Sequence, residues 1–138
     1  MTEISQQDIA TSRFLINQLE SGLRRAGGTH RLFPDIMELL ETGAAQMFQG
    51  DAGVVVTEVI QHPRLRELNV WLAAGQLEDC VRLQPQIEAF ARMNDCDRII
   101  GRGRRGWERV CASRMGMQPA GIFVEKWLRG PPPGEWTP

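Results

Sequence analysis

Two amphipathic helices are predicted at the start of the chain. Apolar residues recur at helical spacing over residues 9–23 and again over residues 36–40. Gly27-Gly28 ends the first stretch, Pro34 suits the first turn of the second helix, and Gly43 ends it. The chain therefore opens with a helix pair.

The hydrophobic period then changes to that of strands. Residues 45–49 can form a short strand, residues 54–60 are rich in β-branched side chains, and residues 67–73 alternate apolar and polar positions. The alternation predicts that Leu68, Val70 and Leu72 share one face, with Trp71 on the polar face. Short, turn-rich connections predict an antiparallel meander.

A long helical stripe follows over residues 77–93, with Pro85 inside it, which predicts a kink or a brief break. A strand over residues 96–100, a helix over 105–115 and a final strand over 120–127 complete the pattern, with parallel pairing through crossovers. The fold class is thus α/β (α+β), with a mixed central sheet and the order α-α-β-β-β-α-β-α-β. We assign residues 1–128 to one domain and residues 129–138 to a proline-rich tail.

Composition excludes several classes of protein. The chain has 138 residues and a net charge of −1, which argues against nucleic acid as a partner. It begins without a basic region followed by an apolar run, so no signal peptide is expected, and it has no apolar stretch long enough for a membrane span. Three cysteines without Cys-x-x-Cys spacing favour reduced thiols, and His30 and His62, far apart in sequence, indicate surface histidines and no metal site.

The segment 101–107, Gly-Arg-Gly-Arg-Arg-Gly-Trp, matches two phosphate-binding patterns. Gly101, Gly103 and Gly106 have the spacing of the dinucleotide fingerprint, and Arg98 begins an Arg-x-x-Gly-x-Gly pattern typical of acyl-CoA-binding acetyltransferases. A dinucleotide site needs its glycines early in a wide parallel sheet, whereas one helix and one strand follow here. A nucleotide-binding module therefore ranks third among the alternatives.

The element order over residues 6–128 resembles that of the GNAT acetyltransferase superfamily. The local match is the strand at residues 96–100, a helix, and then the turn Arg114-Met115-Gly116-Met117. The resemblance implies acetyl-CoA as a possible cofactor, with its pyrophosphate on backbone N–H groups between the fourth strand and the following helix. The corresponding backbone amides belong to four residues: Leu72, Ala73, Ala74 and Gly75. Acetyl-CoA would lie in the splay between the strands around Leu72 and Ile99.

The segment departs from the family pattern in its charge. It has one glycine and no arginine, and Glu78 and Asp79 in the first helical turn would repel a pyrophosphate. The arginine-glycine pattern instead sits one strand later. The usual mode of CoA binding is therefore in doubt on the sequence.

The catalytic groups that the resemblance implies are also altered. The chain has no tyrosine, and Ala112 stands where the family often has a tyrosine acid, so Cys111, Ser113 or water would protonate the thiolate. Glu58 and Glu67 could act as a general base through water, or could be exposed strand carboxylates. The catalytic residues thus remain unassigned on the sequence.

Basic and aromatic residues indicate a protein partner. The candidate anion- or partner-binding residues are Arg102, Arg104, Arg105 and Trp107, to which Trp71, Trp127 and Trp136 add possible interface anchors. A strand Val55-Val56-Thr57-Glu58, a His-Pro turn and a Gly-Arg-x-Gly-Trp-x-Arg helix start resemble those of phage and prophage GNAT-like chains. By this resemblance, the leading hypothesis is a virion-associated or protein-binding component, degenerate in acyl-CoA binding. It would contact a phage or host protein in the host cytoplasm or the virion. The alternative is an acetyl-CoA-dependent N-acetyltransferase with an atypical CoA site.

Overall fold

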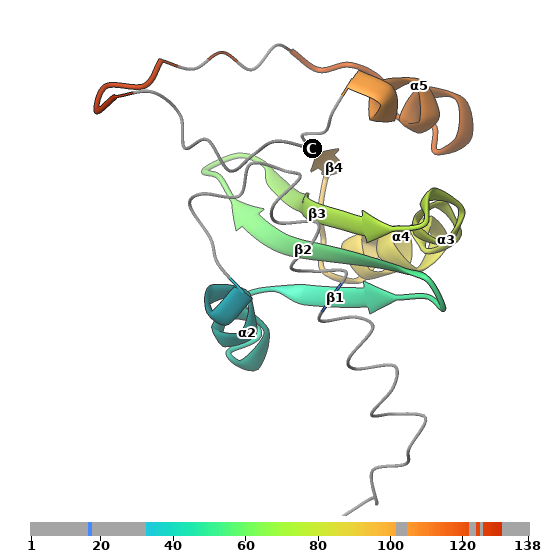
Figure 1. Cartoon of the computed structure of the whole chain (residues 1–138), viewed down its shortest axis with the longest axis horizontal. Coiled ribbons are helices and arrows are strands. Elements are labelled where there is room, and N and C mark those ends of the chain that lie inside the picture. The colour runs from blue at the N-terminus through green and yellow to red at the C-terminus, as the bar shows by residue number, and fades with distance from the viewer. Residues whose placement is uncertain (1–16, 18–32, 102–104, 122–123, 125, 131–138) are drawn as a thin grey trace, which may run out of the picture.

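The computed structural model describes residues 17, 33–101, 105–121, 124 and 126–130. The predicted first helix lies outside these residues except for Asn17, which is helical, and so does the tail beyond residue 130. The described elements, shown in Figure 1, are α2 (Phe33–Glu41), β1 (Gln46–Gln49), β2 (Gly53–Gln61), β3 (Arg66–Gly75), α3 (Leu77–Arg82), α4 (Gln84–Met93), β4 (Arg98–Gly101) and α5 (Arg105–Arg114).

The strands form one mixed sheet, as predicted. Their order is β1-β2-β3-β4, with antiparallel pairing from β1 to β3 and parallel pairing of β3 with β4. The antiparallel part follows from two short turns, and the parallel pair requires the crossover through α3 and α4. The mixed α/β class inferred from the sequence is confirmed.

A β-bulge at Trp71 changes which side chains face each way. Val56 pairs with Leu72 and Thr57 with Val70, so Trp71 is an additional residue in β3. Leu72 consequently packs in the cluster on the α2 side, with Trp71 against it, whereas Leu68 packs on the opposite side. The prediction that Leu68, Val70 and Leu72 share a face was wrong, because regular alternation does not survive an inserted residue.

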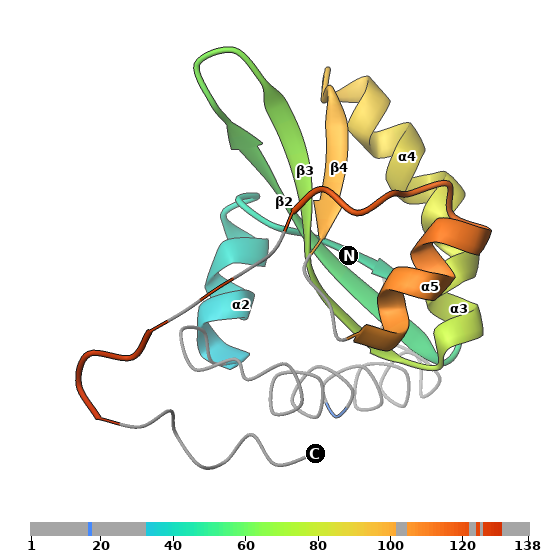
Figure 2. The same cartoon turned by 90° about the horizontal axis from the view of Figure 1, so that it is seen from above.

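The sheet is covered on both faces, and each face has its own core cluster. On one side Ile36 of α2 packs with Val54 and Val56 of β2. On the other side Ile87 of α4 packs with Leu68, which is fully buried. Figure 2 shows α2 on one side of the sheet and α3, α4 and α5 on the other.

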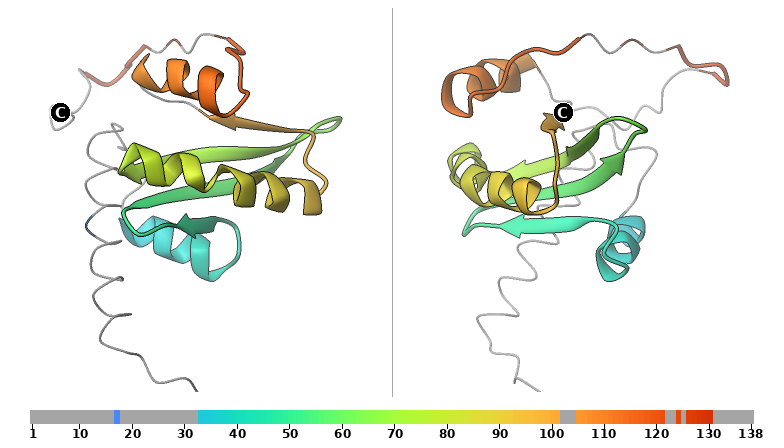
Figure 3. Two further views of the ribbon diagram at one scale, coloured as in Figure 1. Left: turned by 90° about the vertical axis from the view of Figure 1, so that its right-hand side faces the viewer. Right: turned by 180° about the vertical axis from the view of Figure 1, so that it is seen from behind.

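The long helix is interrupted at Leu83, as Pro85 predicted. α3 ends before Leu83 and α4 begins after it, with the proline in the first turn of α4. The Leu83 amide still donates to the Asp79 carbonyl at 3.2 Å, and the Ile87 amide to the Leu83 carbonyl at 3.1 Å. Figure 3 shows the two helices following one another along the same face of the sheet.

The final strand predicted over residues 120–127 is absent from the described part of that segment. Ala120, Gly121, Val124 and Lys126 are exposed and belong to no strand, and Val124 is 83% exposed. Apolar composition suggested a strand, but a strand needs a paired neighbour and a buried face, which these four residues lack. Residues 122, 123 and 125 lie outside the described residues.

Candidate functional site

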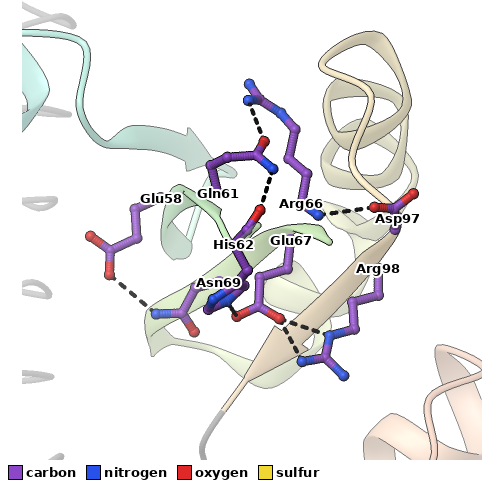
Figure 4. Close-up of polar contacts among 8 residues, drawn as sticks. All are labelled: Glu58, Gln61, His62, Arg66, Glu67, Asn69, Asp97 and Arg98. Atoms are coloured by element: carbon purple, nitrogen blue, oxygen red, sulfur yellow. Dashed lines mark hydrogen bonds and ion pairs between the residues drawn. The ribbon is translucent and has the colours of Figure 1, made fainter. Parts of the chain in front are cut away.

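A row of polar side chains crosses three strands on the face of the sheet that also carries α2. The row comprises Glu58 of β2, Asn69 and Glu67 of β3, Arg98 of β4, and His62 of the β2–β3 turn, and we call it the polar row (Figure 4). Strand register brings the members together, since Glu58 pairs with Asn69 and Glu67 pairs with Arg98. Their apolar neighbours Leu68 and Ile99 point into the opposite core cluster.

Glu67 is the buried centre of the polar row. Its side chain is 5% exposed, in contrast to 47% for His62 and 51% for Arg98. Oε1 lies 2.8 Å from Nε2 of His62, and Oε2 accepts a hydrogen bond of 2.7 Å from Nε of Arg98 and lies 2.7 Å from its Nη2 in an ion pair. Both carboxylate oxygens therefore have partners, and the prediction of an exposed strand carboxylate was wrong for this residue.

These partners keep Glu67 ionised. The hydrogen bond with His62 is the largest influence on the pKa of Glu67; burial opposes it, and Arg98 reinforces it, so that the pKa lies below its ordinary value. Glu58 is half-buried and accepts a hydrogen bond of 3.2 Å from Nδ2 of Asn69. The polar row thus has two strand carboxylates in different surroundings.

The backbone around His62 is held from both strands of the hairpin. The His62 amide donates to the Leu65 carbonyl at 2.8 Å, and Nε2 of Gln61 donates to the His62 carbonyl at 2.6 Å. Arg66 donates from its Nη1 to Gln61 at 3.2 Å, and its backbone amide donates to the Asp97 carboxylate at 2.9 Å. The position of the imidazole is consequently fixed relative to β3 and to the start of β4.

Sequence reasoning placed His62 in a loop and gave it no role. The histidine is in a turn, but its ring reaches back to Glu67, five residues further along. The tight turn after His62-Pro63 could have indicated this contact. A hairpin that pairs Gln61 with Arg66 brings His62 close to Glu67.

The predicted acetyl-CoA residues form the end of β3 beyond its pairing with β4. The last β3–β4 pair is Val70 with Gly101, whereas β2 accompanies β3 as far as Gly75. Among the described residues, Trp71 to Gly75 therefore have no strand on the β4 side. Ile99 pairs with Leu68, so the two strands are still paired beside Ile99, and their described pairing ends at Val70 and Gly101.

Gly75 has a structural role in this segment. Its φ is +94°, and a Cβ placed there would lie 2.3 Å from the Ala52 carbonyl oxygen. The Gln76 amide donates to the same carbonyl at 2.7 Å. Gly75 is thus required for the close packing of the β3–α3 turn against the β1–β2 turn.

The acidic residues of α3 have partners. Asp79 accepts a hydrogen bond from the Ala52 amide and lies 3.1 Å from Nη1 of Arg82. Glu78 forms a two-pronged ion pair with Arg114 of α5, with distances of 2.5 and 2.9 Å. Arg82 and Arg114 therefore offset the negative charge of the two acidic residues at the start of α3.

The candidate proton donors lie on α5. Burial raises the pKa of the Cys111 thiol, which keeps it protonated at neutral pH. Ser113 Oγ donates to the Arg109 carbonyl at 2.9 Å. Arg105 and Trp107 begin α5, but their side chains lie outside the described part of the structure, as do Arg102 and Arg104.

The described residues lack two further features, a metal-binding cluster and a membrane-spanning helix. They contain no group of three histidine, cysteine, aspartate or glutamate side chains suited to holding a metal ion. No helix among them is sufficiently long and apolar to cross a membrane.

The acid stability of the protein should depend on Glu67. The pKa of Glu67 is lower in the folded protein than its ordinary value of 4.5, so ionised Glu67 contributes its full stabilisation above pH 4.5. This stabilisation is lost as the pH falls through the lowered pKa of the folded state. Urea unfolding at successive pH values below 4.5 should show a steeper loss of stability in the wild type than in Glu67→Gln. Equal slopes would show that the contacts of Glu67 do not favour its ionised form.

The mixed sheet and the helices on its two faces have a GNAT-like fold. A probable acetyltransferase superposes with a TM-score of 0.59 at 12% identity, covering 89% of this chain and 94% of that one. A ribosomal-protein-alanine N-acetyltransferase from Brucella melitensis biovar Abortus gives 0.57 at 15% identity (88% and 95%). An aminoglycoside acetyltransferase from an uncultured soil metagenomic sample, solved with trehalose, gives 0.58 at 10% identity (91% of each chain).

These similarities establish the fold. No protein-family model matches the sequence, and no curated protein is significantly similar to it. The structural relatives share 15% identity or less with this chain, so their activities are not transferred with the fold.

Proposed function

We propose that the protein is an acetyl-CoA-dependent acyltransferase with an atypical CoA site. The observation that carries the proposal is that the described pairing of β3 with β4 ends at Val70 and Gly101 while β3 continues to Gly75, so that Leu72 to Gly75 pair with β2 alone among the described strands. An extended backbone edge offers alternating N–H and C=O groups to an extended ligand. The amide-containing arm and thioester of acetyl-CoA are such a ligand.

The side chains of this segment support binding through the backbone. Leu72 and Ala74 are buried in the core cluster on the α2 side, and Ala73 packs against the opposite cluster. Cys80 Sγ lies 3.4 Å from the Ala74 carbonyl and adds to the packing of the strand end. Because its side chains pack on both faces of the sheet, the segment is held rigidly. Its backbone N–H and C=O groups lie in the plane of the sheet.

The phosphate end of the ligand would be held differently from the family pattern. Gly75 already contacts the β1–β2 turn, and Glu78 and Asp79 stand where a pyrophosphate would approach. Pairing with Arg82 and Arg114 offsets their charge. We therefore expect the acyl and pantetheine parts to supply most of the affinity.

Backbone NMR tests the proposal directly. On addition of acetyl-CoA, amide signals of Leu72 to Gly75 should shift, and calorimetry should give micromolar affinity. CoA should shift the same amides, whereas 3′-phospho-ADP, which lacks the pantetheine arm, should bind much more weakly. No shift at millimolar acetyl-CoA would overturn the proposal.

The acceptor is proposed to be a primary amine. Two structural relatives are a ribosomal-protein-alanine N-acetyltransferase and an aminoglycoside acetyltransferase. A peptide with N-terminal alanine and an aminoglycoside are accordingly the first two acceptors to assay, with acetylation followed by mass spectrometry.

The binding role in a phage or host context stays a prediction. Its recognition residues Arg102 and Arg104 lie outside the described residues, and the described structure offers no observation that favours a virion role. An Arg102→Ala, Arg104→Ala, Arg105→Ala variant that retained all partner binding would exclude the loop as the recognition surface.

A further inference from the structure

Glu67 is poorly suited to take a proton from a substrate. Both of its oxygens are occupied, one by His62 and the other by two nitrogens of Arg98. Its side chain is almost fully buried, and its lowered pKa makes it a weak base. If the polar row takes a proton from a substrate, a group other than Glu67 must be the general base.

The contact between Glu67 and His62 fixes the tautomer of the imidazole. An ionised carboxylate only accepts hydrogen bonds, so Nε2 of His62 carries the hydrogen at 2.8 Å from Oε1. In the neutral ring, Nδ1 then has a free lone pair for proton transfer. The ring is 47% exposed, and its backbone is held by Leu65 and Gln61.

We propose that His62 is the general base that removes a proton from the acceptor amine, and that Glu67 and Arg98 are its positioning residues. The inference rests on the acyltransferase function proposed above. Glu67 orients the imidazole and stabilises the imidazolium that forms, and Arg98 anchors the far oxygen of Glu67.

The chemistry balances without a further reactant. The amine nitrogen forms a bond to the acetyl carbonyl carbon, a water molecule passes a proton from that nitrogen to Nδ1 of His62, and the carbon–sulfur bond breaks. CoA leaves as a thiolate and is protonated to the thiol. His62 then returns its proton to solvent, which restores the neutral ring.

The charge of the polar row indicates the class of acceptor. With His62 neutral, Glu58 and Glu67 contribute two negative charges and Arg98 one positive charge, and Arg66 and Asp97 nearby offset each other. The row therefore carries one net negative charge. Such a surface favours a primary amine that arrives as an ammonium ion, releases one proton to water and attacks as the neutral amine.

Steady-state kinetics with acetyl-CoA and the two acceptors named above provide the test. His62→Gln should lower kcat by about a hundredfold or more, while the affinity for acetyl-CoA, measured by calorimetry, stays unchanged. Glu67→Gln should lower kcat by a smaller factor, since the imidazole remains. Arg64→Ala, an exposed position on the same turn, is the matched control and should behave as the wild type.

Two readouts separate a base from a structural residue. The fall of kcat/KM at acid pH should disappear in His62→Gln, and added imidazole should restore activity to His62→Ala. The charged groups of the surrounding segments are Glu58, Arg64, Arg66, Glu67, Asp97 and Arg98. The pH profile of Glu67→Gln shows how far the acid limb depends on the carboxylate beside His62. Nitrogen-15 NMR should find the proton of the neutral ring on Nε2.

The outcomes distinguish the inference from the function on which it rests. A wild type that acetylates either acceptor while His62→Gln retains its kcat and its acid limb overturns the inference alone. A proton on Nδ1 of the neutral ring overturns it as well. No acetyl-CoA binding, or binding without transfer to either acceptor, overturns the proposed function and the inference with it.

Discussion

Gly75→Ala is expected to lower the free energy of unfolding by about 3 kcal/mol or more, the sum of backbone strain and an overpacked contact. The residue has a φ of +94°, a region that side-chain-bearing residues rarely adopt. The new Cβ would lie 2.3 Å from the Ala52 carbonyl oxygen and 2.9 Å from the Gly53 Cα. Both neighbours are backbone atoms, so relief requires the two turns to move apart. Urea denaturation followed by circular dichroism measures the loss.

Gly43→Ala is the matched control for this substitution. Its φ is +79°, and a Cβ there has no neighbour within 4 Å. It should cost only the conformational strain, roughly 1–2 kcal/mol. The difference between the two variants isolates the contact between the turns. Equal losses would show that the turns do not pack as closely as described.

Leu68→Ala should lower the free energy of unfolding by about 2–5 kcal/mol, the usual range for removing a buried leucine side chain. Leu68 is 0% exposed and lies in the core cluster with Ile87 and Leu83. It is flanked in β3 by Glu67 and Asn69, so the loss of packing should also loosen the strand that carries the polar row. Thermal and urea unfolding of the purified variant measure the effect.

Leu128→Ala removes the same atoms from the surface. Leu128 is 84% exposed, so its replacement should change stability by no more than about 0.5 kcal/mol. A large loss at Leu128 would show that the C-terminal segment packs more closely than its exposure indicates. A small loss at Leu68 would contradict the two-sided core.

Local patterns predicted most of the elements. The β-branched run became β2, the proline inside the apolar stripe separated α3 from α4, and the helix that begins near Pro34 became α2. These features depend on neighbouring residues alone. The bulge at Trp71 does not, because it is a property of how β3 pairs with β2, and the alternation of β3 continues through it without a break.

The site was less predictable than the fold. Glu58 and Glu67 were recognised as candidate bases, but the burial of Glu67 and its contact with Arg98, 31 residues away, depend on the parallel pairing of β3 and β4. The contact of His62 with Glu67 could be inferred only from the register of the β2–β3 hairpin, which pairs Gln61 with Arg66. The segment 101–107 matches a recognisable motif, but the members of the polar row match none. A search for motifs therefore could not have identified the polar row.

The bulge at Trp71 also makes the length of β3 a constraint in its own right. One residue more between Leu72 and Gly75, without a second bulge, would reverse the alternation there and turn Leu72 or Ala74 away from α2, exposing the apolar contacts of Ile36. The number of residues at the end of β3 therefore determines both the packing of α2 and the position of the backbone edge proposed to bind the acyl donor. In variants of this chain, a gain of one residue there should be tolerated less well than most substitutions at the same positions.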